Sequence, residues 1–409
     1  MKVLFYNHTG KVSGAERVLL MILARLDHTR FQSVVLCPHG PLVRMARSFG
    51  VRTVPIDSLS ARFTARPDRL VKYLASFVRL IRAARAAVRA ESPGIVHANS
   101  IRAGLVMTAA TIGMKVRVVW HVHDLLPRHP LSTAIRIVAV AFARTEIVAV
   151  SEAVADAFRG ELPRRLAARM RVTVIHNAVD LELFQPNSSK RSTTRRSLEF
   201  SEQELLVGTV GQLTPRKGQL ELIEAFAEIA RDFPTAKLVI VGEALFNRDF
   251  QYADALKKAA QQLGVADRVF FLGQREDVPD VTRALDVAVI NSRAEPFGLT
   301  VVEAMSAGTP VLATAVDGIQ EIIEDRSTGW LVKSGDRHSL VEGLRSLLAA
   351  PQLRAELSTT ALSSVRARFA ADRFMSDFHN FYRGVATKLA SQPAGQISVQ
   401  VNQVNLRAD

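Results

Sequence analysis

The chain has 409 residues, a length at which one compact core usually divides into two domains, and its composition (48% apolar, 22% charged) is that of an ordinary globular protein. The longest apolar run, residues 134–150, is interrupted by charged side chains, so an integral membrane protein is excluded. A single cysteine, Cys37, excludes an intrachain disulfide and favours a reducing compartment. The first residues, MKVLFYNHTG, lack the long apolar core of a signal peptide, and we expect a cytoplasmic protein.

The net charge of +14 is concentrated in the first half of the chain. Residues 1–190 hold 28 Lys and Arg against 12 Asp and Glu, so they carry all of the excess. Four arginines in VRLIRAARAAVRA share one helical face: Arg79, Arg82, Arg85 and Arg89. This face is either an ordinary solvated surface or a contact with the anionic inner face of the cell membrane. No aromatic side chains interleave with these arginines, so we expect no nucleic-acid partner.

The first half of the chain predicts a parallel sheet wound by helices. Its apolar runs do not alternate with polar residues, as is typical of strands buried on both faces: 2–7, 33–38, 94–99, 115–122, 146–151 and 172–177. Helical patterns separate them, for example at 15–26 and 100–113. We therefore predict a doubly wound α/β domain over residues 1–184.

A polar, serine-rich segment, 185–203, predicts a linker, after which the same pattern restarts as a second α/β domain over 204–370. Its expected strands are 205–212, 236–243, 268–273, 286–291, 310–315 and 329–333, and its expected helices are 219–230, 251–263, 299–307 and 339–350. A last helix at 371–390 is expected to pack back on the first domain, and the tail 391–409 to be disordered. Two such domains would form a cleft, with ligands at the carboxyl ends of the strands.

The segment EPFGLTVVEAM, residues 295–305, follows the expected strand 286–291 and begins a helix. Pro296 suits the turn into that helix, and the free amides of Phe297, Gly298, Leu299 and Thr300 form an anion site. Two carboxylates flank this site, Glu295 and Glu303. Since a carboxylate only accepts hydrogen bonds, the pair favours hydroxyl-rich parts of a ligand, and a nucleotide sugar combines a diphosphate with such hydroxyls.

This segment resembles the signature of the family 4 retaining glycosyltransferases of GT-B fold, the group 1 glycosyl transferases. Other segments match the family in order along nearly the whole chain, among them SGAERVL (13–19), VIHNAVDLELF (174–184) and VGQLTPRKG (210–218). The resemblance implies two Rossmann-like domains, the second for a UDP- or GDP-sugar donor and the first for a glycan or lipid-linked acceptor. It also implies that Glu303 binds the ribose diol, that Glu295 contacts the donor sugar, and that the backbone of 297–300 holds sugar and diphosphate oxygens.

The segment GQLTPRKG, residues 211–218, supplies cations for the leaving diphosphate. Arg216 and Lys217 would stabilise the negative charge that develops as the glycosidic bond breaks, a task that a metal performs elsewhere. Because the sequence has no Asp-x-Asp motif, we expect neither a metal nor another cofactor. The family often has arginine where this chain has Gln212, which can donate a hydrogen bond but carries no charge.

The first domain offers further candidates at the ends of its strands. Gly14, in the loop 7–17, resembles the family's glycine that approaches the donor phosphate and the acceptor. In WHVHDLLP, His123 matches a family histidine near the donor sugar, where it would bind a sugar hydroxyl or orient the acceptor, although His121 two positions earlier is an alternative. His97, at the end of another strand, is a weaker candidate for the acceptor pocket.

The residues and the resemblance together predict a metal-independent hexosyltransferase, retaining by the resemblance, that acts in polysaccharide, glycolipid or cell-envelope glycan synthesis. Two alternatives stay open. The first is a nucleotide-sugar epimerase or a phosphorylase of the same fold, although a phosphorylase needs a lysine for pyridoxal phosphate and only Lys217 suggests one. The second is a non-catalytic scaffold, which would have no need of Glu295, Glu303, Arg216 and Lys217 together.

Overall fold

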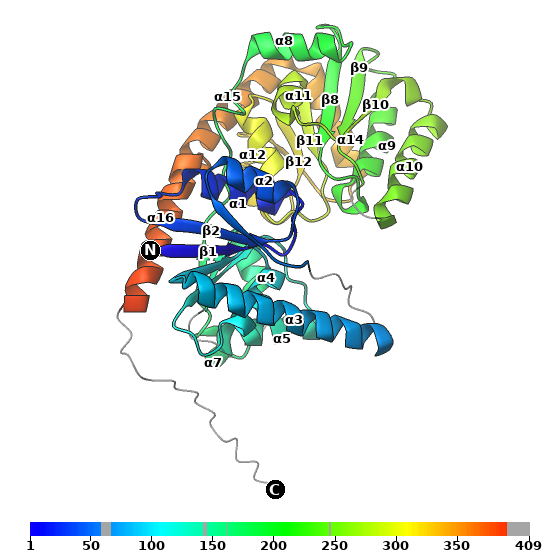
Figure 1. The fold of residues 1–409 in the computed structure, drawn as a ribbon. Coiled ribbons are helices and arrows are strands. Elements are labelled where there is room, and N and C mark those ends of the chain that lie inside the picture. Colours follow the sequence, from blue (N-terminus) through cyan, green and yellow to red (C-terminus); the bar gives the residue numbers. More distant parts are fainter. Residues whose placement is uncertain (59–66, 142–144, 161, 245–246, 391–409) are drawn as a thin grey trace.

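The computed structural model describes residues 1–409 except for 59–66, 142–144, 161, 245–246 and 391–409, and of 67–74, 164, 247–248 and 390 only the backbone. Two parallel sheets wound by helices form two domains (Figure 1), as the sequence predicts for an α/β protein of this class. The tail 391–409, predicted to be disordered, lies outside the described residues.

The first domain contains a sheet of seven parallel strands in the order β3-β2-β1-β4-β5-β6-β7. Its elements are β1 (Lys2–Tyr6), α1 (Gly14–Arg25), β2 (Gln32–Cys37), α2 (Pro41–Ser48), β3 (Arg52–Pro55), α3 (Pro67–Glu91), β4 (Ile95–Ala98), α4 (Ile101–Ala110), β5 (Arg117–Val122), α5 (Pro130–Ala141), β6 (Thr145–Ala149), α6 (Glu152–Arg159), α7 (Arg164–Ala167) and β7 (Val172–Val174). Strand β3 is absent from the sequence prediction, because it is a short edge strand that begins at an exposed arginine and ends at Pro55, and therefore lacks a continuous apolar run.

The second domain contains six parallel strands in the order β10-β9-β8-β11-β12-β13. Its elements are α8 (Ser188–Ser197), β8 (Leu205–Val210), the 3-10 turn η1 (Pro215–Lys217), α9 (Gln219–Ile229), β9 (Ala236–Val241), α10 (Asn247–Gln262), η2 (Ala266–Arg268), β10 (Val269–Gly273), α11 (Val278–Ala284), β11 (Val287–Ile290), α12 (Leu299–Ser306), β12 (Val311–Thr314), α13 (Ile319–Ile322), β13 (Trp330–Val332) and α14 (Arg337–Ala349). The last two helices are α15 (Pro351–Arg368) and α16 (Ala371–Ala390).

In each sheet the strand order reverses at one place, and ligands of doubly wound sheets bind beside such reversals. In the first sheet the reversal lies between β1 and β4, and the residues that follow these strands touch, since Asn99 Nδ2 donates to Asn7 Oδ1 at 3.1 Å. In the second sheet it lies between β8 and β11, where Asn291 Nδ2 donates to the carbonyl of Gly218 at 3.0 Å. The predicted site residues lie around these two places.

The polar segment 185–203 contains α8, which packs on α11 of the second domain. Arg191 and the fully buried Arg195 both pair with Asp286, at 2.7 and 3.2 Å. Arg191 also donates to the carbonyl of Leu285, and Arg195 to that of Ala284. A helix with a polar surface all round carries no apolar stripe, so its amphipathic pattern could not reveal it.

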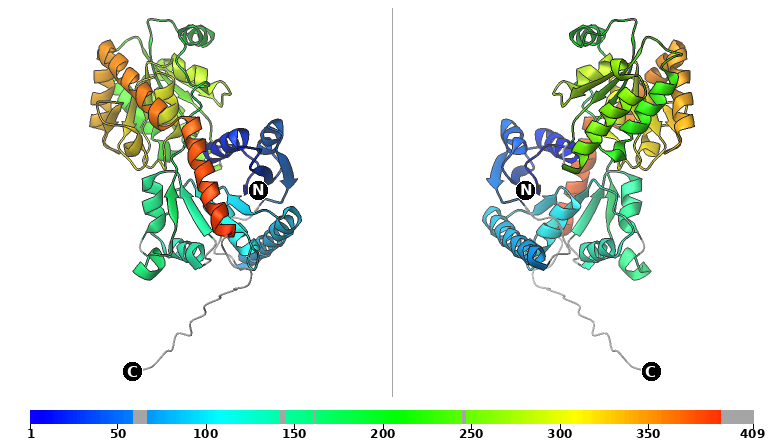
Figure 2. Two further views of the ribbon diagram at one scale, coloured as in Figure 1. Left: turned by 90° about the vertical axis from the view of Figure 1, so that its left-hand side faces the viewer. Right: turned by 90° about the vertical axis from the view of Figure 1, so that its right-hand side faces the viewer.

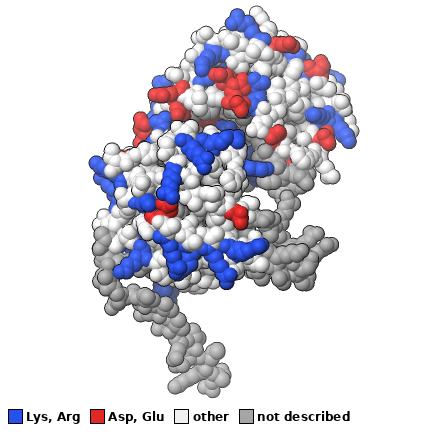
Figure 3. Space-filling model, in the orientation of Figure 1, with Lys and Arg blue, Asp and Glu red and all other residues white. Residues whose placement is uncertain are grey.

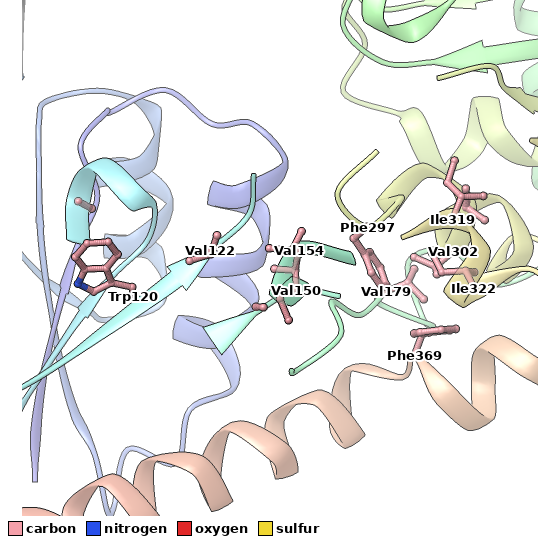
Figure 4. Close-up of a cluster of buried hydrophobic side chains, with 14 of the residues drawn as sticks. Trp120, Val122, Val150, Val154, Val179, Phe297, Val302, Ile319, Ile322 and Phe369 are labelled. Atoms are coloured by element: carbon pink, nitrogen blue, oxygen red, sulfur yellow. The ribbon is translucent and has the colours of Figure 1, made fainter. Parts of the chain in front are cut away.

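Helix α16 leaves the second domain and lies along the first, as the two views of Figure 2 show. The amide of Asp27, just after α1, donates to His379 Nε2 at 3.1 Å, and the Tyr382 hydroxyl contacts His97 Nδ1 at 2.8 Å. Apolar packing also joins the domains. One buried cluster contains Val150 and Val154 of the first domain together with Phe297 of the second (Figure 4). The two domains therefore meet through buried surface.

Candidate active site

The cationic loop after β8 is fixed by contact with the loop after β11. Gly218 has a φ of +65°, and a Cβ atom there would lie 2.1 Å from the carbonyl oxygen of Asn291. Only glycine fits this close approach, which explains the glycine that follows Arg216 and Lys217. The amide of Arg293 donates to the carbonyl of Arg216 at 2.8 Å and ties the two loops a second time.

Arg216, Lys217 and Glu295, all predicted site residues, come together at this junction. Lys217 Nζ donates to Glu295 Oε2, and the hydroxyl of Ser292 donates to the same oxygen at 3.1 Å. A guanidinium nitrogen of Arg216 lies 4.0 Å from that oxygen and donates to the carbonyl of Ala294 at 2.7 Å. The Lys217 and Glu295 side chains are mostly buried, at 15% and 11% exposure, so their attraction is weakly screened by solvent.

The loop 295–298 leads into α12 through Gly298, whose φ of +112° suits glycine. The amides of Val301 and Val302 both donate to the carbonyl of Gly298. Among the described residues, no backbone carbonyl accepts a hydrogen bond from the amides of Leu299 and Thr300. These two amides are therefore available to an anion at the helix N-terminus. The side chain of Phe297 is buried, so only its backbone can serve a ligand.

Glu303 lies half-buried in the second turn of α12. Burial raises the pKa of its carboxyl to about 7, against the opposing effect of the positive charges of Arg17 and Lys217. Arg17 is exposed and belongs to α1 of the first domain, whereas Lys217 belongs to the second. Charges from both domains thus act on this one carboxyl.

The N-terminus of α1 faces that of α12. A Cβ atom on Gly14 would lie 3.4 Å from Leu299 Cδ1, so the glycine loop of the first domain touches the start of the anion-binding helix. Gln212 is positioned differently from Arg216 and Lys217. Its side-chain amide donates to Asp249 of α10 at 2.8 Å, and its backbone carbonyl accepts from Gln219 at 2.9 Å.

The three candidate histidines, His97, His121 and His123, form one cluster, and of these three only His123 is partly accessible. His123 Nε2 lies 3.1 Å from Asn99 Oδ1, and burial lowers its pKa to about 3, so the ring is neutral at physiological pH. His97 and His121 are fully buried and lie 3.2 Å apart between Nε2 and Nδ1. Of the two candidates in WHVHD, His123 is therefore the one that a ligand can reach.

Several residues that hold the predicted ones in place were not apparent from the sequence. Asp317 accepts a hydrogen bond from the amide of Glu295 at 2.9 Å, Ser292 donates to its carboxylate, and Asn99 orients His123. Asn99 and Ser292 lie at or just after the carboxyl ends of predicted strands, and this position alone could have indicated that they belong to the site. Asp317 stands in a loop and carries no pattern.

The described residues contain no group of three or more His, Cys, Asp or Glu that could hold a metal ion, and metal independence stays a prediction. No helix within the described ranges combines the length and apolarity that crossing a membrane requires.

Two Rossmann-like domains that face each other across paired cations, free helix amides and two carboxylates define a GT-B protein. Residues 12–183 match the family model Glycosyltransferase Family 4, and residues 190–363 match Glycosyl transferases group 1. The two matches cover both domains, and the chain belongs to the group 1, family 4 glycosyltransferases.

Curated relatives include the D-inositol 3-phosphate glycosyltransferase of Segniliparus rotundus, 34% identical over 47% of this chain and 43% of that protein. The N-acetyl-alpha-D-glucosaminyl L-malate synthase of Bacillus anthracis is 28% identical over 52% of this chain and 54% of its own length. These matches span about half of each relative. Among solved structures, Anabaena HepE in complex with UDP has a TM-score of 0.78 and 27% identity, covering 94% of this chain and all of that chain. The structure of the same protein in complex with UDP-glucose has a TM-score of 0.78 and 26% identity, and the match covers 96% of this chain and 100% of that chain.

Proposed function

We propose that this protein transfers a sugar from a UDP- or GDP-sugar to an acceptor hydroxyl, with retention of anomeric configuration. The observation that carries the proposal is the junction of Arg216, Lys217 and Glu295 beside the free amides of α12. A diphosphate needs cations and amide donors, and ribose and hexose hydroxyls need acceptors. The UDP and UDP-glucose complexes of HepE support a nucleotide-sugar donor, and favour UDP over GDP for the first assay.

In this proposal the bond between the sugar C1 and the diphosphate oxygen breaks, and a bond from C1 to the acceptor oxygen forms on the same face. The acceptor proton passes to the departing phosphate oxygen. Lys217 and Arg216 stabilise the charge that the diphosphate gains, and the free amides of Leu299 and Thr300 add fixed dipoles. Neutral His123 can donate or accept a hydrogen bond to a sugar hydroxyl without adding charge. No protein nucleophile is required.

The acceptor side of the proposal rests on charge. Arg79, Arg82 and Arg89 of α3 are exposed, and Figure 3 shows basic side chains gathered over this part of the first domain, whereas the second domain displays both signs together. We propose that this face contacts an anionic membrane and that the acceptor is lipid-linked. Arg85 does not belong to it, because its guanidinium donates to the carbonyls of Ala110 and Ile112 at the end of α4.

A panel of UDP-, GDP-, ADP- and dTDP-sugars tests the function. The true donor at a hundred times its Kd stabilises the folded state by about 2.7 kcal/mol and raises Tm, whereas the others leave it unchanged. Nucleotide release with an acceptor then separates catalysis from binding, and the NMR coupling at the product's anomeric carbon tests retention. A donor that binds without any turnover would favour the scaffold, and a trapped covalent glycosyl-enzyme adduct would contradict the one-face mechanism.

A further inference from the structure

A serine at the start of α6 in the first domain holds the ligand loop of the second. The hydroxyl of Ser151 donates to the carbonyl of Pro296 at 2.5 Å and accepts from the amide of Val154 at 3.0 Å. One donor and one acceptor function of the hydroxyl are thereby used. Since Pro296 lies between Glu295 and Phe297, this hydrogen bond reaches the middle of the loop 295–298.

A carboxylate of the second domain completes the contact in the opposite direction. Glu321, in α13, accepts from the amides of Glu152 and Ala153, each at 2.8 Å, and contacts His176 Nε2 at 2.8 Å. These amides are the first two of α6, so a side chain of one domain caps a helix of the other. Burial would raise the pKa of Glu321, but the hydrogen bonds from His176 and the two amides outweigh it and hold the pKa below its usual value.

The chain immediately before α13 grips the same loop from its other side. The amide of Gly318 donates to the carbonyl of Glu295 at 3.1 Å, and Asp317 Oδ2 accepts from the amide of Glu295 at 2.9 Å. A Cβ atom on Gly318 would lie 2.5 Å from the carbonyl oxygen of Pro296, so the two backbones are pressed together. Asp317 has a φ of +40°, an unusual conformation for a residue with a side chain.

The packed side chains around this loop also come from both domains. The ring of Phe297 lies 6.0 Å from that of His176 and 5.7 Å from that of Phe369, between centroids. Figure 4 shows Phe297 between Val154 on one side and Val302 and Ile319 on the other. Because Phe297 packs against both domains, separating them would remove part of the support of the loop.

We propose that Ser151 and Glu321 are positioning residues that hold the loop 295–298 in its ligand-binding conformation only while the two domains are docked at α6 and α13. The inference rests on the proposed function, because it assumes that the loop binds the donor. Neither side chain touches the donor. Each raises donor affinity by increasing the fraction of molecules whose loop is already in the competent form.

The size of the effect follows from the hydrogen bonds that are lost. Hydrogen bonds to a charged group contribute more than neutral ones, and Glu321 makes three of them. We therefore expect the Kd of UDP and the KM of the sugar donor to rise about tenfold or more in Glu321→Ala, and by a few-fold in Ser151→Ala. The kcat at saturating donor changes less, because the cations and carboxylates of the reaction are intact.

The test uses the full chain and measures the Kd of UDP by calorimetry, KM and kcat by nucleotide release, and Tm. Ser151→Thr keeps the hydroxyl and restores parent affinity, which a merely space-filling role of Ser151 does not predict. The matched control is Asp336→Ala, which removes the side-chain cap of α14, a bond from Ser339 N at 3.1 Å. It lowers Tm without changing the Kd of UDP.

Two outcomes separate the inference from the proposed function. If the parent protein binds no nucleotide or nucleotide sugar, the proposed function is wrong and the inference falls with it. If the parent binds UDP, but Ser151→Ala and Glu321→Ala bind it with the parent's Kd, only the inference is wrong. Should Glu321→Ala fail to fold, the Kd of UDP measured for Ser151→Ala and Ser151→Thr decides whether the inference holds.

Discussion

Glu303 offers the sharpest test of how the site functions, because its charge costs stability and, in the proposed function, binds the donor. Its pKa is raised from 4.5 to about 7, so between these two pH values the folded protein holds a proton that the unfolded chain has lost. Stability therefore falls as the pH rises through this window, and the penalty is complete above pH 7. A shift of this size corresponds to roughly 3 kcal/mol.

Replacing Glu303 by glutamine removes this penalty while keeping the shape of the side chain. We expect Glu303→Gln to melt several degrees above the parent at pH 8 and close to it at pH 4.5 to 5. Donor affinity should depend on pH in the opposite way, because it should rise as Glu303 loses its proton. If only the carboxylate accepts the ribose hydroxyls, about nine-tenths of the molecules are competent at pH 8 and about one-tenth at pH 6, so donor affinity of the parent falls about tenfold between them.

Calorimetric titration with UDP at pH 6, 7 and 8, together with thermal melts, measures both effects. Glu303→Gln should bind weakly at every pH, without the acidic decline. Glu356→Gln, a change of an exposed glutamate on α15, serves as the control and should follow the parent in both assays. Two results would refute the reasoning that Glu303 is a buried carboxylate that binds the donor. One is a lower Tm of Glu303→Gln than of the parent at pH 8, and the other is a parent Kd for UDP that does not change from pH 6 to 8.

Four further predictions concern other charged side chains. Lys217→Ala should lower kcat by about 10²–10³-fold, the usual cost of losing one donor to developing negative charge, and undiminished turnover in the nucleotide-release assay would show that Lys217 has no such role. Replacing the three exposed α3 arginines (Arg79, Arg82 and Arg89) together by glutamine should weaken sedimentation with anionic vesicles about 10²-fold at low salt. Arg85→Gln should leave sedimentation unchanged and lower Tm instead, because two carbonyls at the end of α4 lose their donor. Arg195→Ala should lower the free energy of unfolding by about 3–5 kcal/mol, measured by urea denaturation, since Arg195 is buried against Asp286; a loss below 1 kcal/mol would mean that α8 is not anchored there.

The sequence predicted the sheets well because their strands are buried on both faces, and such strands appear as continuous apolar runs. Each of the twelve predicted strands is present, with ends that differ by a few residues. Two of the elements that the sequence prediction omits share a physical cause. Strand β3 lies at an edge and is half-exposed, and α8 is held by buried arginines, so neither buries an apolar stripe that periodicity could detect.

The sequence singles out the two glutamates of EPFGLTVVEAM because they flank a predicted helix N-terminus, and their roles stay predictions. The site was not predictable where a side chain is engaged by a residue distant in the sequence, or where a contact crosses the domain boundary. Gln212 illustrates the first limit, because its donor is engaged by Asp249, 37 positions further along the chain. Glu321 illustrates the second, because its partners in α6 lie about 170 positions earlier.

The two glutamates of the signature, similar in sequence, have opposite surroundings. Glu295 precedes α12 and is bound by Lys217 and Ser292, while its backbone is held by Asp317. Glu303 lies inside the helix, where burial raises its pKa to about 7 against the opposing charges of Arg17 and Lys217. The charge of Glu295 is therefore balanced by Lys217 before any ligand binds, whereas the charged form of Glu303 would be stabilised by hydrogen bonds from ligand hydroxyls. That difference favours a division of labour in which Glu303 senses the donor's ribose and Glu295 keeps Lys217 directed at its diphosphate.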